Sequence, residues 1–221
     1  KRVHHIERLI PAPAAIKRAA ELMKAKKRPL IIAGGGVHYS LATDALREFA
    51  ETFHIPVSET QAGKSAMVWD HELCMGGVGT TGTSAANILA KKADLILAVG
   101  TRLADFPTAS KTAFQNEDVD IITINVNRMD GFKMDSEPVL ADAKLGLEEL
   151  AKALQEAGYK SGYTREELVK LKEDWDQEVE RLYTLQSDQG IVQTTALGVV
   201  NDFVQADDII VCASGSLPGD L

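Results

Sequence analysis

The strongest signal in the chain is an apolar run at residues 30–33 that follows a proline and precedes three glycines. Such a run before a glycine turn is typical of a buried parallel strand. Ser40 is expected to cap the next helix, and a short strand at 55–57 completes a strand–helix–strand unit. The apolar face of that helix comprises Ala42, Ala45, Leu46, Phe49, Ala50 and Phe53.

The same alternation of strands and helices continues to about residue 158, where Gly158 is expected to end the last helix. Strands that alternate with helices predict an α/β fold with a doubly wound, mostly parallel six-stranded sheet of Rossmann-like type. Three glycine-rich turns, at 34–36, 76–82 and 100–102, would meet at its carboxyl edge. The expected helices lie at 14–27, 84–92 and 147–154, and the further strands at 94–100, 121–126 and 138–142.

Beyond Gly158 the pattern changes to a long amphipathic helix. Thr164 and Glu167 form the signature of a capping box at its start. A second helix at 193–205 and a strand at 208–212 are expected to follow. We therefore expect a piece of a longer polypeptide, divided into an inter-domain linker (1–13), a central domain (14–158), a helical linker (159–192) and the truncated start of a further α/β domain (193–221).

Composition narrows the class of partners. The 221 residues carry a net charge of −8, which disfavours nucleic acid and anionic membrane surfaces as partners. No apolar run approaches the roughly 18 residues of a membrane-spanning helix, and no signal peptide is recognised. Cys74 and Cys212 are far apart, which favours free thiols in a reducing compartment and hence a cytoplasmic protein.

Candidate chemistry is sparse. The first turn has Gly34 and Gly36 but Tyr39 where a dinucleotide fingerprint needs its third glycine, so a sharp turn is favoured over an NAD site that would use Glu59. Lys64 is either a ligand or interface contact or a solvated lysine, and Arg102 could pair with Asp105. No catalytic group or metal site is predicted, because the histidines, at positions 4, 5, 38, 54 and 71, lack metal-ligand spacing.

The ordered series of motifs resembles the central domain of thiamine-diphosphate enzymes, the family of acetohydroxyacid synthase and pyruvate oxidase. The resemblance covers about residues 14–155 and rests on RPLIIAGGGV (28–37), LREFAE (46–51), IPV (55–57), ADLILAVGTR (93–102) and the alanine–aspartate–alanine at 141–143. Further stretches, ETQAGKSA (59–66), VGTRLADF (99–106), INVNRMDGF (124–132) and CASGSLPGD (212–220), resemble the family members that hydrolyse a cyclic 1,2-dione.

The resemblance implies a function for a longer parent protein. It implies a hydrolase that uses thiamine diphosphate and Mg²⁺ to open trihydroxycyclohexane-1,2-dione to 5-deoxyglucuronate in myo-inositol catabolism, and that forms a homo-oligomer, a dimer or tetramer. The family's catalytic, diphosphate and metal residues lie outside this chain, so the fragment is expected to be inactive and without cofactor. Alternatives are a carboligase or decarboxylase like acetohydroxyacid synthase, or a stand-alone module that binds FAD, ADP or NAD.

The resemblance also suggests where a nucleotide would bind. The positions that match the FAD-contacting residues of acetohydroxyacid synthase are Gly34, Gly35, Gly36, Gly79, Gly100 and Arg102. The chain departs from that enzyme at Thr80-Thr81, where the family has Met-His, and at Asn125-Val-Asn127, where it has Asp-Ile-Asp. These departures imply that FAD is not retained and that the pocket is empty or vestigial.

Overall fold

Six strands form one sheet in the computed structural model, which describes residues 3–205, 207–211 and 215. Their order is β3-β2-β1-β4-β5-β6 and every pairing is parallel. β1 and β4 are central neighbours, which is the switch point of a doubly wound sheet. The strands are β1 (Pro29–Ala33), β2 (Val57–Glu59), β3 (Cys74–Gly77), β4 (Leu95–Val99), β5 (Asp120–Asn125) and β6 (Glu137–Leu140).

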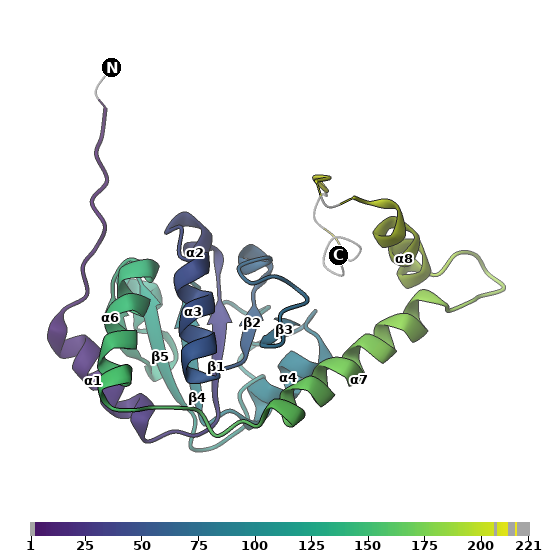
Figure 1. Ribbon diagram of the computed structural model, residues 1–221. Helices are drawn as coiled ribbons and strands as arrows, with labels where there is room; N and C mark the ends of the chain where they lie inside the picture. The colour runs from purple at the N-terminus through teal and green to yellow at the C-terminus, as the bar shows by residue number, and fades with distance from the viewer. Residues whose placement is uncertain (1–2, 206, 212–214, 216–221) are drawn as a thin grey trace.

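Helices cover both faces of this sheet. Contacts of α6 with α1 and α3 place these three helices in one layer, as Figure 1 shows. Right-handed crossovers place α4 on the opposite face, because the chain crosses back over the sheet between β3 and β4. The helices are α1 (Pro13–Lys24), α2 (Gly35–Tyr39), α3 (Thr43–Phe53), α4 (Ser84–Lys92), α5 (Arg128–Gly131), α6 (Ala143–Glu156), α7 (Arg165–Tyr183) and α8 (Gln193–Phe203), with short 3-10 turns η1 (Gln61–Gly63) and η2 (Lys133–Asp135).

The two central strands explain the strongest sequence signals. Every residue of β1 and of β4 is buried, because helices cover both of their faces. The predicted apolar face of α3 is buried as well, and its Phe49 and Phe53 rings meet edge to face with centroids 4.8 Å apart. The fold class predicted from the sequence is confirmed.

The role predicted for Ser40 is wrong. A five-residue helix, α2, begins directly after the first glycine, and Ser40 ends it. Ala42 precedes α3 and makes no side-chain cap. The Ser40 hydroxyl instead accepts a hydrogen bond from the backbone N–H of Ala143 at 3.3 Å, which joins the α2–α3 turn to the start of α6.

Two predictions need correction at β2 and β3. The glycine-rich stretch expected to be a turn at 76–83 begins inside β3, where the main chain pairs with β2. The strand expected at 55–57 starts only at Val57, since Pro56 has no N–H to donate to a neighbouring strand. Glycine has no side chain, so an edge strand that contains glycine lacks the hydrophobic pattern by which a strand is predicted from the sequence.

The C-terminal part follows the predicted helical pattern only in part. Figure 1 shows α7 leading away from the sheet domain to α8. The Thr164 hydroxyl accepts from the Glu167 N–H at 3.2 Å, but the Glu167 carboxylate pairs with Arg28, so the capping box is only half formed. Residues 208–211 form no strand, with Ile209 and Val211 exposed, because no described strand lies beside them; Cys212 is outside the described residues.

Within the described part of the chain, none of the helices combines the length and apolar character needed to cross a lipid bilayer.

Candidate functional site

Two of the predicted glycine turns touch each other at the carboxyl edge of the sheet. The N–H of Gly34 donates to the carbonyl of Val99 at 2.8 Å, and the N–H of Gly36 donates to the carbonyl of Gly100 at 2.9 Å. A Cβ on Gly34 would lie 2.5 Å from the carbonyl oxygen of Gly100. These glycines therefore permit close approach of two backbones at the switch point.

The third turn, around Gly79, packs on the loop that follows β4. A Cβ on Gly79 would lie 2.0 Å from the carbonyl oxygen of Phe106, and that oxygen accepts from the N–H of Thr80 at 3.0 Å. The side chain of Asn87 accepts from the Gly79 N–H at 2.9 Å and donates to the Gly79 carbonyl at 3.0 Å. Most donors of this turn are therefore used inside the protein.

Arg102 lies at the same edge, two residues after Gly100. Its side chain is exposed and makes no hydrogen bond or ion pair with the described residues, so the predicted pair with Asp105 is absent there. Its carbonyl accepts from the ammonium of Lys133 at 3.2 Å. Gly35 faces a different neighbour, with a Cβ position 3.2 Å from the carbonyl oxygen of Ala62. Among the described residues, Arg102 therefore follows the Gly100 turn with an exposed side chain that has no partner.

The Glu59 carboxylate forms hydrogen bonds with the loop that follows it. Its two carboxylate oxygens accept from the N–H groups of Ser65, at 3.1 Å, and Met67, at 2.9 Å. Burial raises the pKa of Glu59, while these two backbone donors act in the opposite direction. This use of the carboxylate favours the turn interpretation over a ribose-binding acid.

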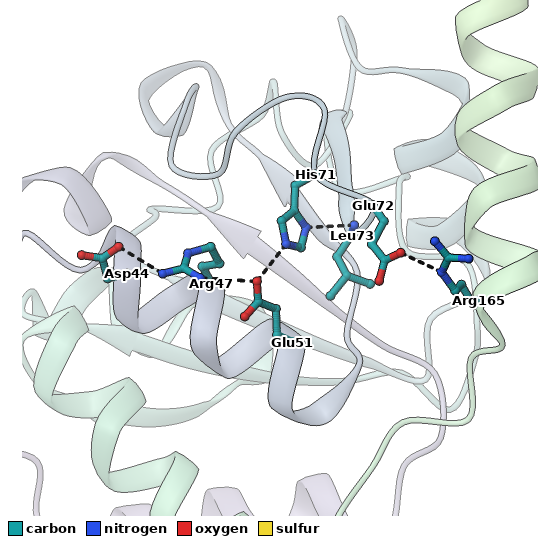
Figure 2. Close-up of polar contacts among 7 residues, drawn as sticks. All are labelled: Asp44, Arg47, Glu51, His71, Glu72, Leu73 and Arg165. Carbon is teal, nitrogen blue, oxygen red and sulfur yellow. Dashed lines mark hydrogen bonds and ion pairs between the residues drawn. The ribbon is translucent and has the colours of Figure 1, made fainter.

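Two polar connections were not anticipated from the sequence. Arg8 pairs with Asp142 at 2.9 Å and also donates to the Ser40 carbonyl at 2.7 Å. His71, in the loop between β2 and β3, forms a hydrogen bond of 3.0 Å with the carboxylate of Glu51 on α3 (Figure 2). The arginine–aspartate pair joins residues 134 positions apart, so neither hydrophobic periodicity nor a local motif could have indicated it.

Comparison with known proteins decides the family. The sequence model described as "Thiamine pyrophosphate enzyme, central domain" matches residues 16–150, more than half of the chain. The chain belongs to this family. The matched residues include the whole sheet and the carboxyl edge described above.

Curated relatives match the chain along its full length. A 3D-(3,5/4)-trihydroxycyclohexane-1,2-dione hydrolase of Clostridium tetani is 46% identical over 245 residues, and proteins of the same name from Clostridium perfringens and Bacillus cereus are each 44% identical. Each alignment covers 100% of this chain and 38% of the relative. The chain therefore spans well under half the length of these relatives.

Metal-binding side chains do not gather in the described part of this domain. Among the described residues no group of three or more histidine, cysteine, aspartate or glutamate side chains could hold a metal ion. Cys74 is a buried free thiol whose pKa is raised by burial. We therefore derive no chemical step through a thiamine cofactor from these residues.

Proposed function

We propose that this chain is the central domain of a thiamine-diphosphate-dependent hydrolase that opens a cyclic 1,2-dione. One observation carries the proposal: the whole chain aligns at 44–46% identity with relatives that bear the name trihydroxycyclohexane-1,2-dione hydrolase. The alignment extends past the sheet domain over α7 and α8, which a resemblance limited to the fold would not require. The substrate class is thus a small cyclic diketone.

The role of this domain in the parent is to hold the segments on either side of it. On the N-terminal side, Arg8 reaches Asp142 and Ser40 at the carboxyl edge, and the N–H of Asp142 donates to the carbonyl of Leu9 at 2.8 Å. These contacts seat the residues before α1 against the first turn of α6. The N-terminal linker is therefore fixed to the edge where the glycine turns meet.

On the C-terminal side, the linker is held at the opposite edge of the sheet. The N–H of Gly162 donates to the carbonyl of Lys27, just before β1. Arg28 lies over the Tyr163 ring, 4.4 Å from its centroid, and pairs with Glu167. The two flanking segments are therefore anchored at opposite ends of the strands, which suits a domain that spaces and orients its neighbours.

The remaining properties of the parent follow from its family. We propose thiamine diphosphate and Mg²⁺ as its cofactors, myo-inositol catabolism as its pathway, the cytoplasm as its compartment and a homo-oligomer as its assembly. The cofactor would supply the electron sink for cleavage of a ring C–C bond. Nucleic acid and membranes are not proposed as partners, since the chain carries a net charge of −8.

The full-length protein encoded by the parent gene provides the test. With thiamine diphosphate and Mg²⁺ it should consume the cyclic dione and release the open-chain acid, and it should not release CO₂ from pyruvate. Decarboxylation or carboligation of pyruvate without dione opening would favour an enzyme like acetohydroxyacid synthase instead. The isolated 221-residue chain should give a flat calorimetric titration with Mg²⁺ and thiamine diphosphate.

We also propose a weak anion site at the carboxyl edge, formed around Arg102 beside Gly34, Gly35, Gly36, Gly79 and Gly100. The exposed Arg102 guanidinium supports it, because a planar fork that has no partner among the described residues suits a phosphate. The internally bonded N–H groups of Gly34 and Gly36 limit the affinity. FAD is not expected, so the purified chain should lack flavin absorbance.

ADP titrated into the isolated chain tests this site. Binding should be weak, and Arg102→Ala should weaken it further, whereas Arg18→Ala, which removes a surface charge already paired with Glu137, should leave it unchanged. Equal binding by the wild type and the Arg102→Ala variant would contradict the site.

A further inference from the structure

The loop between β2 and β3 is tied to three separate parts of the molecule. Its outer half, residues 69–73, contacts α7 and α3, and its inner half, residues 64–67, is held at the end of β2. We propose that this loop is a rigid link that makes the carboxyl edge of the sheet respond to the position of α7. This inference concerns the domain itself and does not depend on the activity of the parent.

The contact with α7 has two parts. Arg165, the first residue of α7, donates to the Glu72 carboxylate at 2.8 Å. Nearly two turns later, Lys172 donates to the carbonyl of Trp69 at 2.7 Å, and its ammonium lies 5.7 Å from the centroid of the Trp69 ring. Two points of contact along one helix fix both the position and the direction of α7 relative to the loop.

The contact with α3 passes through His71 (Figure 2). The N–H of Leu73 donates to His71 Nδ1 at 3.1 Å, and His71 Nε2 lies 3.0 Å from a Glu51 oxygen. Because Nδ1 accepts, the proton belongs on Nε2, which donates to Glu51. Arg47 flanks the same carboxylate at 3.5 Å, so α3 serves as a fixed support for the outer half of the loop.

The inner half of the loop ends at the carboxyl edge. The Glu59 carboxylate holds the N–H groups of Ser65 and Met67, and the side chains of Ala66, Met67 and Leu73 are buried in the core. Buried side chains at both ends leave the backbone between them little freedom to absorb a displacement. A change at Glu72 should therefore reach the residues that follow β2.

The consequence concerns communication along the chain. α7 leads to α8, at the far end from the sheet domain (Figure 1). A movement of α7 and α8 relative to the sheet domain would displace Arg165 and Lys172. Their contacts with the loop would transmit that displacement to residues 64–67, which lie beside the glycine turns. Since His71 and Glu72 are adjacent, the supports on α3 and α7 act on the same short piece of backbone.

Hydrogen exchange by mass spectrometry on the 221-residue chain tests this link. The double variant Arg165→Gln/Lys172→Gln removes both charges and shortens both side chains, so that neither contact between α7 and the loop is kept. We expect exchange in peptides that cover 64–73 to become about three- to tenfold faster, in line with the loss of two polar surface contacts. Peptides from β1 and β4 should exchange as before.

The matched control is Arg181→Gln, which removes a charge from α7 whose partner, Glu178, lies on the same helix. It should leave exchange at 64–73 unchanged. Glu72→Gln removes the loop's side of the ion pair with Arg165, and it should reproduce part of the faster exchange. Faster exchange confined to 69–73, with 64–67 unchanged, would overturn the link, and so would unchanged exchange throughout the loop.

Discussion

The backbones of Gly36 and Gly100 lie in direct contact at the switch point of the sheet. The Gly36 N–H donates to the Gly100 carbonyl at 2.9 Å, and a Cβ on Gly36 would lie 2.6 Å from the Gly100 Cα. Gly100 itself has a φ of +61°, which glycine adopts without strain. The close approach joins the ends of the two central strands, β1 and β4.

The first prediction follows from this contact. Gly36→Ala places a methyl group against backbone that cannot rotate away, so the free energy of unfolding should fall by at least about 2 kcal/mol. Gly77→Ala is the control, because the nearest atom to its Cβ position is 3.8 Å away. Urea titration should show a large loss for the first variant and nearly none for the second. Equal losses would show that the Gly36 site can relax.

The same contact shows why the sequence predicted the fold better than the site. The runs in β1 and β4 are buried on both faces, so their apolar character predicted two buried strands of a parallel sheet. The glycines after them were correctly placed at the carboxyl edge. Their sequence could not tell whether they approach a ligand or another stretch of backbone, because both need a residue without a side chain.

Other features escaped prediction for physical reasons. β3 contains two adjacent glycines, so it lacks an alternating pattern. Ser40 has the side chain of a good N-cap, but its hydroxyl instead accepts a hydrogen bond from the N–H of Ala143, which is distant in the sequence. Glu59 was noticed for its place at the end of a strand, while its partners Ser65 and Met67 are set by a loop whose shape no local rule specifies.

The second prediction concerns the Tyr163 hydroxyl. It is buried and has no hydrogen-bond partner among the described residues, while the ring stacks under Arg28. Tyr163→Phe keeps the ring and removes a polar group that is desolvated without compensation. Stability should stay the same or rise by up to about 1 kcal/mol. Tyr163→Leu, which removes the aromatic face, should instead be destabilised in the same denaturation assay.

A third prediction is a dependence of stability on pH that Glu59 causes. Burial raises its pKa above the ordinary value of 4.5, so the folded protein binds this proton more tightly than the unfolded chain does. The stability from Glu59 is therefore complete below that ordinary value and is lost as the pH rises through the folded pKa.

Urea unfolding of the wild type and Glu59→Gln across this range measures the effect. The difference in unfolding free energy between the two proteins should change in favour of the variant as the pH rises, because only the wild type must keep a buried charge. Glu51 and Glu178 have lowered pKa values and act in the opposite direction, but they are present in both proteins and cancel. A difference that does not vary with pH would contradict the burial argument.

The last prediction separates two roles of Asp142, which caps α6 and pairs with Arg8. Its carboxylate accepts from the N–H groups of Lys144 and Leu145, and Arg8 donates to it at 2.9 Å. Asp142→Ala removes both roles and should cost about 1–3 kcal/mol, most of it from the lost cap. Arg8 is 40% exposed, so Arg8→Ala should cost no more than about 1 kcal/mol.

Asp142→Asn distinguishes the two contributions, because an asparagine still caps a helix but lacks the charge that attracts Arg8. Its loss of stability should be closer to that of Arg8→Ala than to that of Asp142→Ala, and the double variant Arg8→Ala/Asp142→Asn should be no worse than Arg8→Ala alone. If Arg8→Ala were as damaging as Asp142→Ala, the ion pair rather than the cap would hold the start of α6. The N-terminal linker would then be part of the domain's stability and not only seated on it.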